Sequence, residues 1–375
     1  MLHRIIVAFF RSDGPYLYVR LVTASYALSA VARLVPVRSK QVPGYRPRVP
    51  AVVWYGTTTF AALAVVACTF VLSGAFGPAR QPGAAPSPAA ALPHVRAGFH
   101  LGVFEPEETV SYRSVTDFAT AVGREPDLVL LYSGWGEPFL TRFAETAYAH
   151  GAEPVVQIYP PANGNLAEIA MGRRDGYLRS YAAQVRAFGH PVILSFAPEP
   201  NGPWYWWGWT RTPAPTWVAA WRHVVTIFRA SGATNVTWLL TLNVSFRGSG
   251  PVADYWPGTA YVDWIGIDGY YQRPRQTFRN HFLPTVQAVR KLTRKPLLIS
   301  EVAVGPIAGQ LRGITDLFAA TQHYGLTGLV WFDKRQNRGI HHQDWRLEDN
   351  PAAVALFRRE ARAFGRPLPP ARPGG

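Results

Sequence analysis

Eight short apolar runs within residues 97–366 constrain the fold more than any other feature of this sequence. Most of them are separated by segments whose apolar residues recur every three or four positions, as in amphipathic helices. Eight strands alternating with helices predict a (β/α)8 barrel, also called a TIM barrel. An open doubly wound sheet is the alternative, but no glycine-rich phosphate loop follows the first run. The runs cover residues 98–104, 127–133, 154–159, 192–197, 236–242, 262–269, 296–302 and 328–332.

The helical pattern is clear in five of the segments between runs and in one segment after the last run, and it is weak between the fifth and sixth runs. Residues 245–258, between the fifth and sixth runs, are rich in glycine and proline, so we expect a loop there. The six predicted helices cover residues 137–150, 175–188, 216–230, 278–292, 309–323 and 352–364.

Composition supports a large folded domain and locates the charge near the start of the chain. The chain has 375 residues, of which 48% are hydrophobic, and this excludes wholesale disorder. The net charge is +15, and residues 1–80 hold nine Lys/Arg against one acidic residue. This basicity fits an anionic membrane surface better than a nucleic acid, because no zinc-finger spacing or RNA-binding signature accompanies it.

The N-terminal region predicts a membrane anchor and a tether. Residues 51–72 are apolar and uncharged, and are long enough to cross a bilayer. Four Lys/Arg closely precede them and only Arg80 closely follows, so the positive-inside rule places the later residues outside the cell. A buried core helix and a cleaved signal peptide are the alternatives. The predicted parts are a basic cytoplasmic segment (1–50), a transmembrane signal anchor (51–76), a Pro/Ala-rich linker (77–93), a catalytic barrel (94–366) and a disordered tail (367–375).

Residues 1–50 fit either amphipathic helices on the membrane face or a dispensable extension.

The cysteine and histidine residues limit the chemistry that the chain can perform. Cys68 is the only cysteine, so neither an intramolecular disulfide nor a cysteine-based metal cluster can form. His341 and His342 are an isolated pair in a predicted loop, and we interpret them as solvated rather than as metal ligands.

Carboxylates and aromatic residues gather where the predicted strands end, which in such barrels is where active sites lie. Glu199 ends the fourth run, between two prolines, and Glu301 lies in the seventh. Four tryptophans and a tyrosine then occupy five of the six positions 204–209, and indole rings stack well on the C–H faces of sugars. Other residues at or near strand ends are His100, Glu105, Trp135, Tyr159, Asn243, Asp268, Tyr270, Trp331 and Asp333.

Two glutamates on opposed strands suit the hydrolysis of a glycosidic bond. Retaining glycosidases use one carboxyl group to protonate the leaving oxygen and another, about 5–5.5 Å away, to attack the anomeric carbon. Strands four and seven face each other across a barrel mouth, so we expect Glu199 and Glu301 to meet there. A structural role for either glutamate, as a salt-bridged strand end, is the alternative.

Residues 97–366 also resemble glycoside hydrolase family 26, the β-mannanase family in the large clan of (β/α)8 retaining glycosidases. The resemblance is carried by several motifs in the family's order. They are residues 172–177 (GRRDGY), 199–204 (EPNGPW), 221–223 (WRH) with 235–238 (NVTW), 262–270 (VDWIGIDGY), 299–301 (ISE), and 331–333 (WFD) with 344–346 (DWR).

The resemblance implies roles for the strand-end residues. Glu199 would be the general acid/base and Glu301 the nucleophile. Tyr270 would hydrogen-bond the nucleophile, and Asp268 would help shape the site. Trp204 and Trp331 would stack on sugars next to the cleavage point. The remaining substrate-binding candidates are Asn201, Trp207, Trp135, Tyr159 and Asn243. For Asn201, support of the turn is the favoured role.

One residue departs from the family pattern, because Pro198 stands where the family usually has a histidine. The departure puts mannan in question as the substrate.

We therefore predict a membrane-anchored β-glycanase that faces the outside of the cell and needs no cofactor. Its candidate substrates are β-mannan, mixed-linkage β-glucan, or an exopolysaccharide made by the same cell. The alternatives are a catalytically silent carbohydrate-binding protein, and a polysaccharide-synthesis accessory protein acting through its N-terminal segment.

Overall fold

The computed structural model describes residues 6–11, 17–22, 98–106, 111–162, 164–305, 308–335 and 343–364. The chain divides into two compact units, Met1–Gly83 and Ala84–Gly375.

In the first unit, β1 (Ile6–Arg11) pairs antiparallel with β2 (Leu17–Val22). Amphipathic helices were one of the two possibilities for residues 1–50, and the residues described there form strands instead. The predicted anchor (51–76), linker (77–93) and tail (367–375) lie outside the described residues. Among the residues that are described, no helix combines the length and the apolar character needed to span a bilayer.

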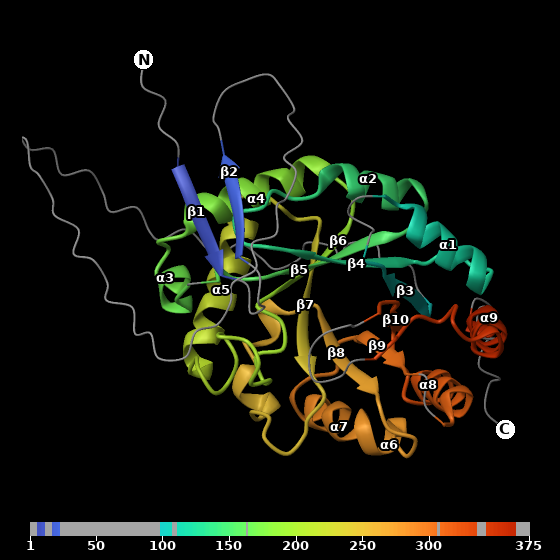
Figure 1. The fold of residues 1–375 in the computed structure, drawn as a ribbon. Coiled ribbons are helices and arrows are strands. Elements are labelled where there is room, and N and C mark those ends of the chain that lie inside the picture. Colours follow the sequence, from blue (N-terminus) through green and yellow to red (C-terminus); the bar gives the residue numbers. More distant parts are fainter. Residues whose placement is uncertain are drawn as a thin grey trace, which may run out of the picture. The chain divides into compact units, whose positions relative to one another are not determined.

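The second unit contains a closed barrel of eight parallel strands, as the sequence predicts (Figure 1). The strand order is β10-β3-β4-β5-β6-β7-β8-β9, so neighbours in sequence are neighbours in space and the last strand closes on the first. The strands are β3 (His100–Phe104), β4 (Leu128–Ser133), β5 (Glu153–Ile158), β6 (Val192–Phe196), β7 (Val236–Asn243), β8 (Trp264–Tyr271), β9 (Leu297–Val304) and β10 (Gly328–Phe332).

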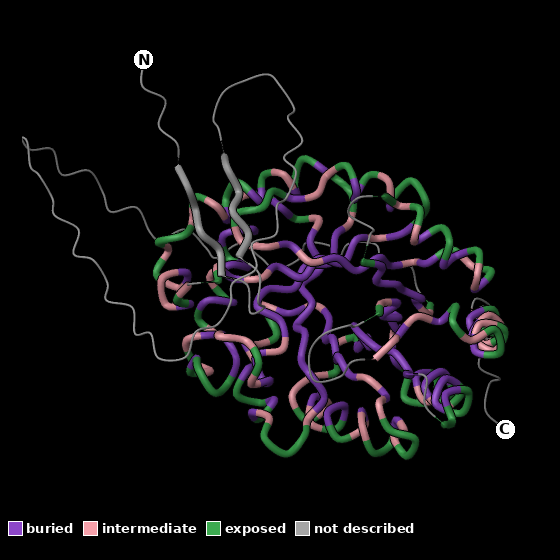
Figure 2. The backbone as a smooth tube through the Cα atoms, in the orientation of Figure 1, coloured by how far each residue is buried: buried purple, intermediate pink, exposed green. Residues whose placement is uncertain are grey.

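Helices surround the barrel, and the tube in Figure 2 shows buried strands at the centre with exposed residues along the outer turns of the helices. The α-helices are α1 (Arg113–Val122), α2 (Thr141–Ala149), α3 (Leu166–Ala170), α4 (Asp175–Phe188), α5 (Ala214–Ala230), α6 (Phe278–His281), α7 (Leu283–Leu292), α8 (Gln310–His323) and α9 (Pro351–Phe364).

Three details of the helical layer can be compared with the helices and loop predicted from the sequence. The sequence pattern missed α1, whose apolar face buries Val115, Phe118 and Val122. The predicted helix at 278–292 is two helices, because Pro284 in the first turn of α7 favours a new helix start there. As expected from its glycines and prolines, the connection between β7 and β8 holds only the 3-10 turns η1 (Val252–Tyr255) and η2 (Thr259–Tyr261).

The strand register brings polar residues of successive strands together. Asn243 at the end of β7 is level with Asp268 of β8, and Asp268 is level with Glu301 of β9. On the other side of the barrel, Tyr132 of β4 is level with Gln157 of β5. The carboxyl ends of these strands therefore form one polar region within an apolar barrel.

Candidate active site

Glu199 lies on a sharp turn that follows β6. Ala197 has φ 45° and Glu199 has φ 53°, and these are the positive-φ residues other than glycine in the described part of the chain. This left-handed backbone is strained for residues with a Cβ. Backbone hydrogen bonds hold it, since the Ala197 N–H donates to Ile158 O and the Glu199 N–H donates to Thr241 O, each at 3.0 Å. The turn is thus anchored to the two strands that flank β6.

The carboxyl group of Glu199 accepts two side-chain hydrogen bonds. Asn243 Nδ2 donates to Oε1 at 2.6 Å, and the indole N–H of Trp204 donates to Oε2 at 2.7 Å. Burial raises the pKa of Glu199 to about 7, and the charge of Glu301 adds to this shift, while the two donors oppose it. A carboxyl group with this pKa can keep a proton at neutral pH and donate it.

Glu301 has a different set of partners. The Tyr132 hydroxyl donates to Oε1 at 2.6 Å, Gln157 Nε2 donates to the same oxygen at 3.2 Å, and the Tyr270 hydroxyl donates to Oε2 at 2.5 Å. Burial raises the pKa of Glu301, and these three donors oppose the shift by stabilising the carboxylate. Their arrangement suits a carboxylate that is held ionised and oriented.

Asp268 is fully buried beside this pair and accepts a hydrogen bond from the Ser300 hydroxyl at 2.5 Å. Burial raises its pKa well above the ordinary range, and the neighbouring Glu301 and Glu199 raise it further. The protonated form of Asp268 is therefore favoured beside the carboxylate of Glu301.

Aromatic rings form one wall of the site. The ring of Trp204 is 41% exposed and lies parallel to Phe246, with ring centroids 6.0 Å apart. The hydroxyl groups of Tyr159 and Tyr205 are 3.1 Å apart, and Trp135 is half-buried against Tyr177. Trp204 and Asn243 thus contact Glu199 directly, and Trp135 packs between Tyr177 of α4 and Phe196 of β6. The substrate-binding roles of these residues and of Tyr159 stay predictions.

Three predicted substrate-binding residues are placed elsewhere. Trp331 has no exposed surface and packs edge-on against Phe357 of α9 at 5.1 Å, so the stacking role expected for it is wrong. Successive side chains of a strand point to opposite faces, and this alternation directs Trp331 to the helical layer. Trp207 is 3% exposed and donates to Pro198 O at 2.8 Å. Asn201 is fully buried and exchanges two hydrogen bonds with the backbone of Asn243, so it supports the turn.

Sequence reasoning missed Tyr132 and Gln157, both of which donate to Glu301. Each follows a run of apolar residues within its strand, LVLL before Tyr132 in β4 and PVV before Gln157 in β5. A buried polar side chain needs a hydrogen-bond partner, so this interruption was the available signal. The sequence did not reveal which strand would supply that partner.

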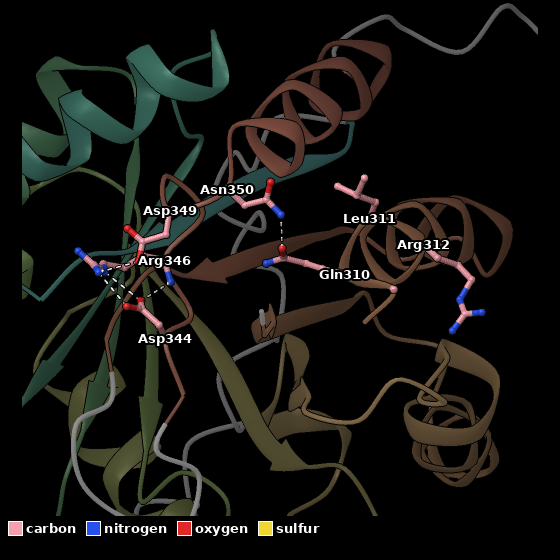
Figure 3. A pocket seen from close by; sticks show the side chains of 8 residues that line it. Gln310, Leu311, Arg312, Asp344, Arg346, Asp349 and Asn350 are labelled. Atoms are coloured by element: carbon pink, nitrogen blue, oxygen red, sulfur yellow. Dashed lines mark hydrogen bonds and ion pairs between the residues drawn. The ribbon is translucent and has the colours of Figure 1, made fainter. Parts of the chain in front are cut away.

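A pocket of about 650 Å³ lies apart from the two glutamates, and Figure 3 shows its lining. Its polar groups satisfy one another, since Arg346 pairs with Asp344 and Asp349 at 2.8 Å each, and Asn350 donates to Gln310 at 2.7 Å. Within the described residues, no group of three or more His, Cys, Asp or Glu side chains could hold a metal ion. His341 and His342 lie outside that part of the chain.

Comparison with known proteins connects this geometry to a family. The model of "Glycosyl hydrolase family 26" matches residues 167–358. The chain is 30% identical over 287 residues to "Endoglucanase H" of Acetivibrio thermocellus, covering 71% of this chain and 31% of that protein. It is 30% identical over 192 residues to "Mannan endo-1,4-beta-mannosidase A and B" of Caldalkalibacillus mannanilyticus, covering 44% of this chain and 35% of that protein. The chain thus spans about a third of the length of these curated relatives.

A solved structure agrees at the level of the fold. The family 26 β-mannanase of Bacteroides ovatus superposes with a TM-score of 0.57 at 18% identity, covering 72% of this chain and 89% of that chain. The family match spans Glu199, Glu301 and the residues that donate to them from β7, β8 and the loop after β6. The chain belongs to glycosyl hydrolase family 26.

Proposed function

We propose that the barrel is a retaining β-glycanase that cleaves a β-linked polysaccharide by double displacement. The observation that carries this proposal is the contrast between the two buried glutamates. Glu199 has a pKa near 7, and Glu301 accepts hydrogen bonds from three side chains. One glutamate is thus prepared to give a proton and the other to attack as a carboxylate.

In the first step Glu199 transfers its proton to the glycosidic oxygen. A Glu301 oxygen attacks the anomeric carbon, the bond from that carbon to the leaving oxygen breaks, and a glycosyl ester forms on Glu301. Tyr132, Tyr270 and Gln157 hold the attacking carboxylate in position.

In the second step Glu199 acts as a base. It takes a proton from water, the water oxygen attacks the anomeric carbon, and the ester to Glu301 breaks. Both steps invert the anomeric centre, so the product keeps the configuration of the substrate. No metal or organic cofactor enters this scheme.

The named relatives are an endoglucanase and mannan endo-1,4-β-mannosidases, so β-glucan and β-mannan are the substrate classes that we propose. Pro198 offers no side-chain donor beside the acid/base, where the resemblance leads us to expect a histidine. This difference favours a sugar other than mannose, with mixed-linkage β-glucan as the first candidate.

The test uses the purified chain with a panel of β-mannan, β-glucan and mixed-linkage glucan, followed by product sizing and NMR of the anomeric protons. We expect oligosaccharides of retained configuration, and at least a 1,000-fold loss of activity in Glu301→Ala, of the order found when a nucleophile is removed. With azide and a dinitrophenyl glycoside, Glu301→Ala should yield a glycosyl azide of inverted configuration. Binding without cleavage, equal in wild type, Glu301→Ala and Glu199→Ala, would instead support a carbohydrate-binding protein.

We also propose that the barrel faces the outside of the cell on a membrane anchor. The support is the apolar, uncharged segment 51–72 with basic residues before it. Protease treatment of intact cells should remove the barrel, and protection from protease would argue against this orientation. A loss of polysaccharide export on deletion of residues 1–50, with hydrolysis unchanged, would support a synthesis partner bound by that segment.

A further inference from the structure

The turn that carries Glu199 has two backbone carbonyl groups that the barrel cannot pair. β6 ends at Phe196, and the left-handed residues Ala197 and Glu199 turn the chain away from the strand direction. The Ala197 and Pro198 carbonyls therefore leave the ladder of hydrogen bonds while both residues remain buried. A buried carbonyl without a partner is unfavourable, so this backbone needs donors from outside the sheet.

Two buried tryptophans supply those donors. The indole N–H of Trp217, on α5, donates to Ala197 O at 3.1 Å, and the indole N–H of Trp207, on the loop after the turn, donates to Pro198 O at 2.8 Å. Trp217 has no exposed surface and Trp207 is 3% exposed. Neither indole N–H is bonded to the carboxyl group of Glu199. Each donates instead to the backbone of the turn that carries this residue.

Both indoles are themselves held firmly. Trp207 stacks on Tyr205 with ring centroids 4.2 Å apart and an angle of 9° between the planes. Trp217 stacks on Trp221 at 5.2 Å and meets Tyr255 edge-on at 5.7 Å. Donors that are fixed by packing can hold the carbonyls in one orientation. The strained backbone of the turn persists only because surrounding groups hold it in this way.

We propose that Trp207 and Trp217 are positioning residues, whose indole N–H groups fix the strained turn so that Glu199 can transfer its proton. This inference rests on the proposed function and deepens it. It also assigns Trp207 a role other than stacking on sugar. The physical reason is that a misplacement of about 1 Å in a catalytic group can cost roughly 100-fold in rate.

The experiment compares Trp217→Phe and Trp207→Phe with Trp221→Phe in the full chain. Trp221 is a matched control, because it is also a buried tryptophan of α5, but its indole donates to Tyr261 O, away from the turn. Phenylalanine at this position removes that N–H and keeps an aromatic ring against Trp217. Each variant is assayed on the polysaccharide that the wild type cleaves, and on dinitrophenyl β-cellobioside or β-mannobioside. Dinitrophenolate leaves without protonation, so the first step on that substrate does not need the proton of Glu199.

We expect kcat/KM on polysaccharide to fall roughly 10- to 100-fold in Trp217→Phe and Trp207→Phe. We expect kcat/KM on the dinitrophenyl glycoside to stay within about 3-fold, while kcat and KM on it fall together because the second step still needs Glu199 as a base. Azide, which attacks without a base, should restore kcat. Trp221→Phe should leave the ratio between the two substrates unchanged.

The possible results separate this inference from the function on which it rests. The positioning role would be overturned if kcat/KM fell equally on both substrates in the two variants, or if they responded like Trp221→Phe. In either case hydrolysis by the wild type would still uphold the proposed glycanase function. A wild type that cleaves neither substrate would overturn the proposed function and this inference with it. If Trp217→Phe does not fold, Trp207→Phe decides the matter, because Trp207 lies outside the helical layer.

Discussion

Glu301 and Glu199 carry identical carboxyl groups, but different residues donate hydrogen bonds to them. Glu301 accepts from two phenol groups and an amide, whereas Glu199 accepts from an amide and an indole and faces the charge of Glu301. The neighbouring residues therefore divide the roles, because a donor stabilises a carboxylate and a nearby negative charge stabilises a protonated acid.

Tyr270→Phe tests this division at Glu301. The change removes the 2.5 Å hydrogen bond to Oε2 and keeps the aromatic ring. A hydrogen bond to a charged group contributes about 1.5–3 kcal/mol, so kcat/KM should fall roughly 10- to 150-fold. The acid limb of the pH profile should move to higher pH, because the ionised form of Glu301 loses a donor.

The matched control is Tyr271→Phe, the next residue of the same strand. Its hydroxyl donates to Asp316 at 3.2 Å, on the helical side of the barrel. The acid limb should not move in this variant. A shift of equal size in both variants would show that the effect comes from the strand and not from the contact with Glu301.

At the level of elements, the barrel depends on the close approach of its first and last strands. β10 pairs with β3, and Gly328 is level with His100. A Cβ at position 328 would lie 2.0 Å from the carbonyl oxygen of His100, which is main chain and cannot rotate away. Glycine at this position therefore allows the barrel to close.

Gly328→Ala should destabilise the barrel by about 3 kcal/mol or more, because one of the two strands must move to admit the methyl group. Urea unfolding followed by circular dichroism measures this loss. Gly176→Ala is the control, since position 176 is exposed in α4 with no atom within 4 Å of the added Cβ. It should stabilise the fold by about 0.5–1 kcal/mol, and a similar gain in Gly328→Ala would contradict the argument.

At the scale of the whole molecule, buried carboxyl groups connect stability to pH. Burial raises the pKa values of Glu199, Glu153 and Asp333 to about 7 each. A group whose pKa is higher in the folded state contributes stability that is fully present below its unfolded pKa, near 4.5 for glutamate. That stability is lost as the pH rises through 7. The barrel should therefore be more stable at pH 5 than at pH 8.

Glu199→Gln should reduce this dependence, because an amide does not ionise. Relative to wild type, the variant should gain about 2–3 kcal/mol of stability between pH 4 and pH 8. This gain adds to a loss that is the same at every pH, because the amide nitrogen of glutamine cannot accept from Asn243 or Trp204. Thermal and urea unfolding across this range measure the effect. Glu145→Gln, at an exposed position of α2, is the control and should follow wild type at every pH. Parallel curves for wild type and Glu199→Gln would show that Glu199 does not carry the predicted proton.

The sequence predicted the eight strands of the barrel and singled out the two glutamates, whose catalytic roles stay predictions, but it did not reveal the residues around them. Alternating apolar runs predicted the eight strands because each strand needs a helix to cover its outer face. Glu199 and Glu301 were predicted because they lie where strands end. Tyr132 and Gln157 were missed, since their contact with Glu301 depends on strand register across the barrel.

By itself, then, the sequence determined the eight strands, their order around the barrel and most of the helices, and it pointed to the glutamates associated with β6 and β9. Only the tertiary structure decided that Trp331 faces the helices, that Trp207 and Trp217 donate to the turn of Glu199, and that Glu301 has three donors. The reason is that local pattern specifies whether a residue is helical or extended. The direction of a side chain and the identity of its partner depend on how distant strands are staggered when the barrel closes.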